Sequence, residues 1–189
     1  MSTQQVVCFF CSADNNVSDS LKACTEQIGS YLASKNLRVL TGGSEAGLMK
    51  CVADGYLKNG DPKQFQMVIP QVFRHKENTQ HLGLSAENVL WVESFHEQLR
   101  HFESVASVFI VMPGGYGTLL EFFHLLNQKK VSGSEAKIIL FNFNGFWDCL
   151  LKQFDFMVDE NTLKQEHRDL FYVARLPSDL NNIIFDLEK

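Results

Sequence analysis

The 189-residue sequence lacks long apolar runs, a basic excess and a paired set of cysteines. No apolar run approaches the roughly 20 residues of a membrane-spanning helix, and Met1–Gln5 has no secretory-signal features. The net charge of −5 disfavours a nucleic acid polymer as partner, because proteins that bind one usually carry a basic excess. The five cysteines are an odd number and several lie in apolar segments, which indicates reduced thiols. These absences predict a cytoplasmic protein with no membrane and no nucleic acid partner.

What remains is the composition of one globular domain, 45% hydrophobic and 21% charged. Apolar runs predict strands at Val6–Cys11, Arg38–Leu40, Gln66–Ile69, Asn88–Val92, Val105–Met112, Lys137–Phe141 and Phe171–Ala174. Helical periodicity predicts helices at Ser18–Ser34 (with Ser18 as N-cap), Leu48–Leu57, Phe95–Ser104, Thr118–Gln128, Phe146–Phe156 and Ser178–Leu187. The polar segment Gln71–Glu87 is interpreted as a long functional loop. This alternation predicts an α/β fold, a parallel sheet with helices on both faces, in a single domain over residues 1–189.

The segment P-G-G-Y-G-T-L-L-E at residues 113–121 is the most informative part of the chain. It follows an apolar run and opens a helical pattern. Glycines at a strand-to-helix junction leave backbone N–H groups and the positive end of a helix open to an anion, which predicts a phosphate cradle. Glu121 lies three residues after Thr118, on the same face of the helix. A carboxylate beside a phosphate cradle indicates that positive charge develops on the substrate during a reaction.

A second glycine-rich turn, T-G-G-S-E-A-G-L-M, occupies residues 41–49. Its glycines lack the G-x-G-x-x-G spacing of a dinucleotide fingerprint, and no Lys-Ser or Lys-Thr of a Walker A loop follows. A nicotinamide-dependent oxidoreductase is therefore disfavoured. Taken alone, this turn is explained equally well by backbone geometry and by ligand binding. The helix start S-F-H-E-Q-L-R at residues 94–100, taken alone, is typical of a solvated amphipathic surface.

Neither the cysteines nor the histidines show the spacing of a chemical site. Cys8 and Cys11 form C-x-x-C, but within a strand this spacing places them on opposite faces, so buried thiols are expected. His96 and His101 are five residues apart on a predicted helix and do not share a face as metal ligands would. We therefore expect no metal site.

Taken together, these segments resemble the Lonely Guy (LOG) family, long labelled possible lysine decarboxylases. Residues 113–121 match its P-G-G-x-G-T-x-x-E signature, and residues 42–49 resemble its G-G-G-S-x-G-L-M. Residues 10–12, 68–70 and 94–97 resemble its F-C-G-S, V-I-P and S-M-H-E segments. The resemblance covers roughly the first 155 residues and implies a Rossmann-like, doubly wound parallel sheet, and a homodimer.

The resemblance also implies an activity. Family members hydrolyse the N-glycosidic bond of nucleoside 5′-monophosphates, AMP or a cytokinin riboside 5′-monophosphate, to free base and ribose 5-phosphate, without a cofactor. It implies that Glu121 is catalytic and that the glycine turn holds the 5′-phosphate. Carried over by position, the substrate-binding residues are Gly43, Glu77, Gly114, Gly115, Tyr116, Gly117, Thr118 and Asn127. The decarboxylase label has no support, since no lysine stands in a pyridoxal-phosphate context.

The chain departs from the family in its helix motif M-H-x-R-K, whose arginine is considered catalytic. Gln98 and Leu99 occupy the arginine and lysine positions. Gln98 can donate a hydrogen bond but carries no charge, and Arg100 is rotated by about 200° around the helix. Losing one preorganised donor typically costs 10²–10³ in rate, roughly 3–4 kcal/mol. We therefore expect a weakened phosphoribohydrolase, with Gln98 as a catalytic candidate beside Glu121 in the position of the family arginine. The alternative is a non-catalytic nucleotide sensor or carrier similar to molybdenum-cofactor carriers.

Overall fold

The fold is built on seven parallel strands, as a computed structural model that describes residues 5–74 and 84–186 shows. The strands are β1 (Val6–Phe10), β2 (Arg38–Thr41), β3 (Phe65–Pro70), β4 (Val89–Val92), β5 (Val108–Val111), β6 (Lys137–Phe141) and β7 (Tyr172–Ala174). The helices are α1 (Asp19–Ser34), α2 (Gly47–Leu57), α3 (Phe95–Val105), α4 (Tyr116–Ser132), α5 (Asp148–Asp159), α6 (Gln165–Arg168) and α7 (Pro177–Phe185). In the described part, no helix has the length and apolar character needed to cross a bilayer.

The strand order is β4-β3-β2-β1-β5-β6-β7, so the chain builds outward from β1 and then starts again at β5 on its other side. β1 pairs in parallel with both β2 and β5. In a doubly wound sheet this reversal opens a crevice at the carboxyl ends of the two central strands, where ligands bind. The predicted Rossmann-like, doubly wound α/β fold is confirmed, and both glycine-rich turns lie at this end of the sheet.

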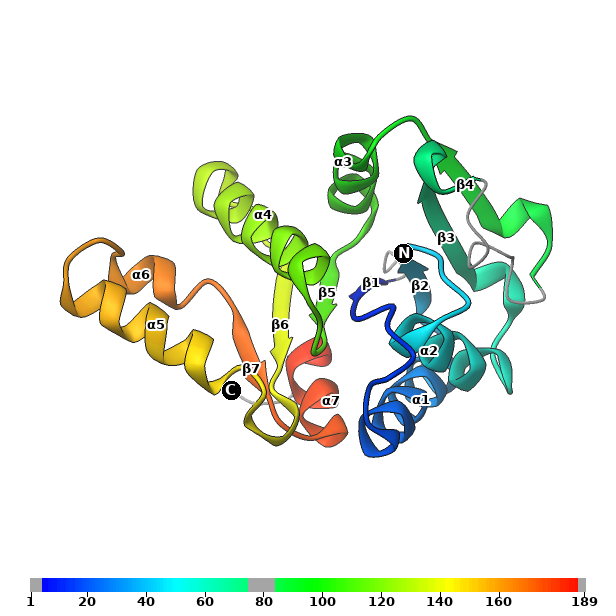
Figure 1. Ribbon diagram of the computed structural model, residues 1–189, viewed down its shortest axis with the longest axis horizontal. Coiled ribbons are helices and arrows are strands. Elements are labelled where there is room, and N and C mark those ends of the chain that lie inside the picture. Colours follow the sequence, from blue (N-terminus) through cyan, green and yellow to red (C-terminus); the bar gives the residue numbers. More distant parts are fainter. Residues whose placement is uncertain (1–4, 75–83, 187–189) are drawn as a thin grey trace.

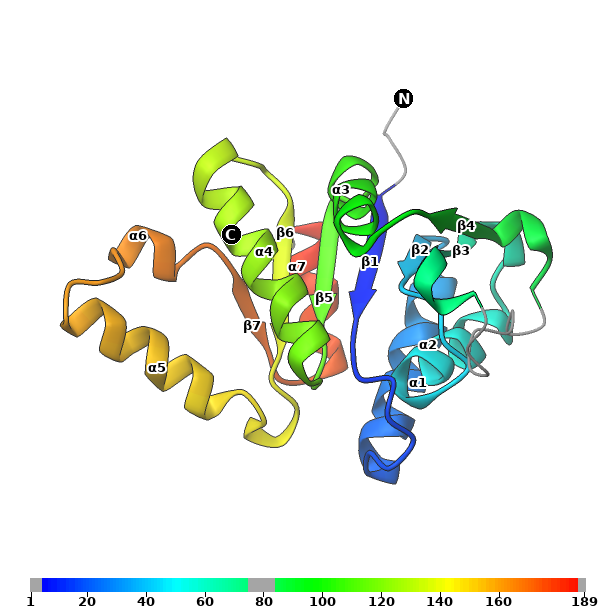
Figure 2. The ribbon, with the colours of Figure 1, turned by 45° about the horizontal axis from the view of Figure 1, so that its top comes forward.

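Helices cover both faces of the sheet (Figures 1 and 2). On each face an apolar layer of buried side chains holds them in place. Side chains of α1, α2 and α7 pack on one face, where Val7, Phe9 and Cys11 point. Side chains of α3, α4 and α5 pack on the other, where Cys8 and Phe10 point. The alternation along β1 is that of a strand buried on both sides. It also places the two thiols in different layers, as their spacing predicts.

Most predicted elements are present, with shifted ends. Ser18 caps α1, as predicted, because its side chain accepts the N–H of Leu21. Val105 was predicted to start a strand, but it ends α3, since Ala106 still donates its N–H to Phe102, and β5 begins only at Val108. The helix after the second glycine turn is longer than predicted and ends where Gly133 adopts φ +69°, a common helix stop. The short helix α6 was not predicted, because its sequence is polar throughout.

Candidate functional site

The second glycine-rich turn joins the end of β5 to the first turn of α4, with Gly115 as N-cap. A Cβ on Gly114 would lie 2.1 Å from Oγ1 of Thr118, so only glycine lets this buried threonine fold back onto the turn. At Gly115 and Gly117, by contrast, a Cβ would meet nothing within 4 Å. The first N–H groups of a helix have no partner within the helix and carry its positive dipole. The turn therefore presents donors to open space, the geometry that suits a phosphate.

Glu121 lies in the second turn of α4 and is half-buried. Burial raises the pKa of its carboxyl to about 8. The thiols of Cys8 and Cys11 are close enough for the Glu121 charge to act on them, and burial together with this charge raises the pKa of both. The carboxyl therefore sits against the end of β1 in surroundings that disfavour its ionised form. A cation or a hydrogen-bond donor placed beside it would favour the ionised form and lower its pKa.

The first glycine-rich turn, between β2 and α2, is shaped by two glycines with positive φ. Gly43 has φ +72°, and a Cβ there would lie 2.6 Å from the Ile69 side chain. Gly47 has φ +57°, and a Cβ there would lie 2.7 Å from the Ser12 carbonyl oxygen. Both positions require glycine for backbone reasons alone. For Gly43, predicted to bind substrate, this structural requirement accounts for the residue without any ligand.

A loop that the sequence interpretation missed connects the two glycine-rich turns. It follows β1, and its Ser12 donates its N–H to the Pro113 carbonyl at 3.2 Å and accepts the N–H of Leu48 at 2.9 Å. Asn15 adds a side-chain contact, since its Oδ1 accepts the N–H of Gly47 at 2.9 Å. The signal in the sequence was the short polar run S-A-D-N-N at residues 12–16, typical of a structured turn.

A cavity of about 250 Å³ opens where this loop approaches the second glycine-rich turn. It combines polar groups of the loop after β1 with apolar side chains of α1 and an aromatic ring that follows β6. Its lining is Ser12, Asp14, Asn16, Val17, Leu21, Pro113, Gly114 and Phe146. The cavity lies at the carboxyl ends of β1 and β5, the position that the reversal of strand order assigns to a ligand.

Gln98, predicted at the arginine position, is buried and already engaged. Its Nε2 donates to the Val68 carbonyl at 2.7 Å, and a Cβ on Gly42 would lie 3.5 Å from the same nitrogen. The amide therefore links α3 to the end of β3 directly beside the first glycine-rich turn. Leu99 is also buried, whereas Arg100 is exposed to solvent.

The remaining residues predicted to bind substrate differ in their exposure and in their position relative to Glu121. Tyr116 is 94% exposed at the start of α4. Asn127 is exposed, and six residues of helix rotate it about 240° away from Glu121, so the structure does not bring these two side chains together. Glu77 lies outside the described residues. Among those described, no group of three or more histidine, cysteine, aspartate or glutamate side chains is arranged to hold a metal ion.

Comparison with known proteins shows which family the chain belongs to. Residues 49–184 match the family model described as possible lysine decarboxylase. The chain belongs to this family, the LOG family. Among curated relatives, the rice (Oryza sativa subsp. japonica) probable cytokinin riboside 5′-monophosphate phosphoribohydrolase LOGL9 is 29% identical over 97% of this chain and 77% of its own length. The Arabidopsis thaliana cytokinin riboside 5′-monophosphate phosphoribohydrolase LOG3 is 25% identical over 92% of this chain and 79% of its own length.

Solved structures share the fold of this LOG-family chain at lower identity. The molybdenum cofactor binding protein of Rippkaea orientalis superimposes with a TM-score of 0.68 at 17% identity, covering 99% of both chains. The molybdenum cofactor carrier protein of Chlamydomonas reinhardtii gives 0.67 at 14% identity, covering 98% of both. At these identities the likeness concerns the fold alone.

Proposed function

We propose that this LOG-family protein hydrolyses the N-glycosidic bond of a nucleoside 5′-monophosphate, AMP or a cytokinin riboside 5′-monophosphate, to free base and ribose 5-phosphate. The observation that carries the proposal is the half-buried Glu121 carboxyl one helical turn beyond a glycine cradle with open space in front of it. The names of the two relatives, one a cytokinin riboside 5′-monophosphate phosphoribohydrolase and the other a probable one, support the same reaction.

In this proposal the cradle binds the 5′-phosphate. Its oxygens accept hydrogen bonds from the N–H groups at the start of α4, and the helix dipole adds a favourable field. Gly115 and Gly117 contribute by the absence of side chains, because a Cβ at either position would occupy the space the phosphate needs. The bound phosphate thereby fixes the position of the ribose relative to Glu121. The reacting groups are then already oriented when the reaction begins, which lowers its entropic barrier.

Glu121 then acts on the ribose. As the bond to the base breaks, its electron pair leaves with the base and positive charge develops at the sugar carbon. An ionised Glu121 stabilises that charge electrostatically and accepts a proton from the attacking water. The reaction is complete when water oxygen is bonded to the sugar carbon and a proton is on the departing base. Because burial raises the pKa of Glu121 to about 8, the ionised fraction limits the rate near neutral pH.

Gln98 serves in this scheme as a positioning residue. Its side chain holds the end of β3 beside the first glycine-rich turn through the Val68 carbonyl. A neutral amide with a committed N–H cannot replace a guanidinium that grips an anion through two bonds. The expected consequence is a rate lower by roughly 10²–10³ than an enzyme with the arginine would show.

The absence of charge at positions 98 and 99 favours a second candidate function, a nucleotide sensor or carrier that binds its ligand without hydrolysing it. Gln98 and Leu99 are both buried and leave no charge in the arginine and lysine positions of the family motif. The glycine-rich turn at residues 113–121, by contrast, matches the family signature. A protein with this arrangement would retain affinity for the phosphate while losing the chemistry.

Chromatographic detection of free base separates the two functions. The purified protein is incubated with AMP and with isopentenyladenosine monophosphate, alongside Glu121→Ala and a matched control, Glu160→Ala, at an exposed position on the end of α5. Base release that Glu121→Ala abolishes and Glu160→Ala retains supports the hydrolase. Calorimetric binding of the nucleotide without any base release supports the carrier. Base release that survives in Glu121→Ala contradicts the proposed mechanism.

We also propose that the protein is a cytoplasmic homodimer that associates through α4. Phe122 and Leu125 of this helix are buried in the core and are not available to a second copy. The exposed apolar side chains are instead Tyr116, Leu120, Phe123 and Val131, which follow one face of α4. Covering such a stripe with a second copy would remove it from water. Analytical ultracentrifugation should show a dimer that Leu120→Glu dissociates; a monomeric wild-type protein would contradict the proposal.

A further inference from the structure

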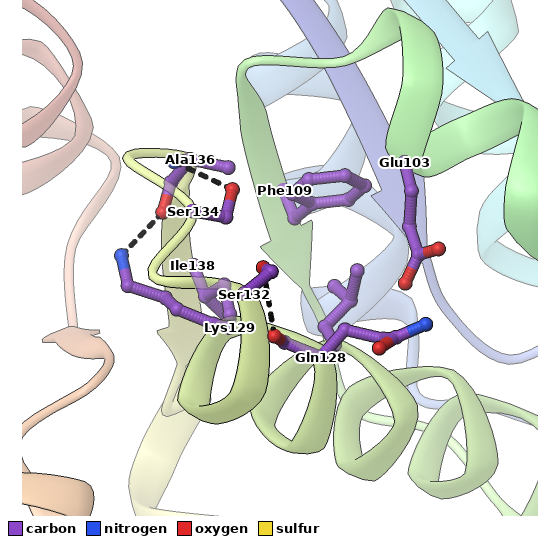
Figure 3. A pocket seen from close by; sticks show the side chains of 9 residues that line it. Glu103, Phe109, Gln128, Lys129, Ser132, Ser134, Ala136 and Ile138 are labelled. Atoms are coloured by element: carbon purple, nitrogen blue, oxygen red, sulfur yellow. Dashed lines mark hydrogen bonds between the residues drawn. The ribbon is translucent and has the colours of Figure 1, made fainter.

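A cavity of about 210 Å³ lies between α3 and α4, at the end of the sheet where β5 and β6 begin (Figure 3). Its walls include Glu103 of α3, Leu125 and Gln128 of α4 and Phe109 of β5. The facing sides of the two helices therefore do not interdigitate there, as side chains in a close-packed core would. At this depth the separation of α3 and α4 has to be set by another contact.

An ion pair supplies that contact. Glu103 extends from α3 toward α4 (Figure 3), and Nε2 of His124 on α4 lies 2.8 Å from its Oε1. Both atoms are buried, and neither has another hydrogen-bond partner within the described residues. A carboxylate oxygen is only an acceptor, so the ring nitrogen that faces it carries a proton. Separating the two side chains would leave both atoms buried and unpaired, which makes the contact costly to break.

No other hydrogen bond or ion pair joins α3 to α4 in the part of the chain that the structure describes. On α3, the Gln98 side chain donates to the end of β3. On α4, Lys129 donates its Nζ to the Ala136 carbonyl, on the side of the cavity away from Glu103 (Figure 3). The Glu103–His124 pair is therefore the polar link between the two helices.

This link lies close to the candidate site. α3 and α4 each begin where a strand of the parallel sheet ends, so they run in the same direction. His124 follows Glu121 by three residues, which places both side chains on the same side of α4, about 4.5 Å apart along its axis. Because His124 reaches α3, Glu121 lies on the side of α4 that faces α3. The neighbouring helix thus contributes to the burial that raises the pKa of the Glu121 carboxyl to about 8.

We propose that the Glu103–His124 pair is a positioning element of the candidate site. It keeps α3 beside the Glu121 carboxyl, which excludes solvent from one side of that carboxyl and fixes its direction toward the sugar. The phosphate cradle belongs to α4 and the turn before it, and does not depend on the pair. Loss of the pair is therefore expected to lower kcat while leaving KM for the nucleotide nearly unchanged. The effect on kcat rests on the proposed function, whereas the effect on the burial of Glu121 does not.

A double-mutant cycle in urea unfolding measures the link itself, with Glu103→Ala, His124→Ala and the double variant. The double variant should be at least about five-fold more stable, in its unfolding equilibrium constant, than addition of the two single effects predicts. Arg100→Ala and Lys130→Ala, at exposed positions on the same two helices, form the control cycle and should be additive within about two-fold. Additive effects for Glu103 and His124 would overturn the proposal. Methionine replaces any alanine variant that circular dichroism shows to be unfolded.

The burial of Glu121 is measured without turnover, from the pH above which the stability difference between each protein and its Glu121→Gln counterpart no longer changes. This pH should fall by at least about half a unit in both Glu103→Ala and His124→Ala, because water then reaches the carboxyl. Loss of the two charges by itself would shift it in opposite directions, down without Glu103 and up without His124. An unchanged value in both variants, or opposite shifts, would contradict the positioning role.

Base release from AMP completes the test. Glu103→Ala and His124→Ala should lower kcat about ten-fold or more with KM within about two-fold of the wild type. Glu103→Gln, which keeps an oxygen that accepts from His124, should retain most of the wild-type kcat. An active wild type whose kcat survives both alanine substitutions refutes the positioning role. A wild type without base release, in which the coupling and the Glu121 shift are nevertheless found, refutes the proposed function and leaves the positioning role standing.

Discussion

The raised pKa of Glu121 links the chemistry of the site to the stability of the fold. Its carboxyl has a pKa of about 8 in the folded protein, against an ordinary value of 4.5. Between these two pH values the folded protein holds a proton that the unfolded chain has released. Stability therefore falls as the pH rises from 4.5 to 8 and stays level above, because the folded state must then bury a charge. At about 1.36 kcal/mol per pKa unit, the upper limit is roughly 4–5 kcal/mol, less what solvent reaching this half-buried side chain removes.

Glu121→Gln removes this titration while keeping the shape of the side chain. We expect the variant to be about as stable as the wild type near pH 5 and more stable at pH 8.5, by up to a few kcal/mol. The same substitution abolishes base release, and wild-type base release rises with pH toward a plateau above pH 8 as Glu121 ionises.

The assay is urea unfolding followed by circular dichroism at half-unit steps from pH 4.5 to 9, for the wild type, Glu121→Gln and the exposed control Glu160→Gln. Only the difference between wild type and each variant matters, since histidines and other groups titrate in all three proteins. If the difference for Glu121→Gln stays constant across this range, the carboxyl is not held protonated by burial and the reasoning is wrong.

Three further substitutions test the two glycine-rich turns. Gly115→Ala should fold normally, because its Cβ meets nothing within 4 Å, yet lose AMP affinity in calorimetry; unchanged affinity would place the phosphate elsewhere. Gly43→Ala should cost about 1–3 kcal/mol in urea unfolding, since Gly43 has φ +72° and its Cβ would meet Ile69 at 2.6 Å, and a neutral effect would contradict the backbone argument. Gln98→Leu should cost about 1–3 kcal/mol by leaving the Val68 carbonyl unpaired, and a melting temperature equal to wild type would contradict this role.

The sequence predicts the architecture well because the position and type of each strand and helix follow from local patterns of residues. Within the described residues, apolar runs and helical periodicity locate the seven strands and six of the seven helices, and glycines between strand and helix mark both turns. Errors occur where neighbouring elements decide the boundary, as at Val105, whose β-branched side chain suits a strand but which completes α3.

The site is predicted only in part, because its contacts join residues distant in the sequence. No local pattern relates Glu121 to the thiols of Cys8 and Cys11, so neither its burial nor its raised pKa can be seen before folding. The Gln98 side chain likewise could be interpreted as a substitute for arginine until the structure showed its N–H donated to Val68. The family motif identifies which residues differ from the pattern, and the fold determines what they contact instead.

The loop after β1 has a further consequence. Ser12 uses only main-chain atoms to hold the Pro113 and Leu48 segments, so its connections do not depend on which side chain it carries. The bonds from Ser12 to the two turns therefore remain possible when the side chain at position 12 changes. The link between the two turns is thereby made of backbone, separate from the side chains that would contact a ligand, and different chemistries can evolve on such a backbone.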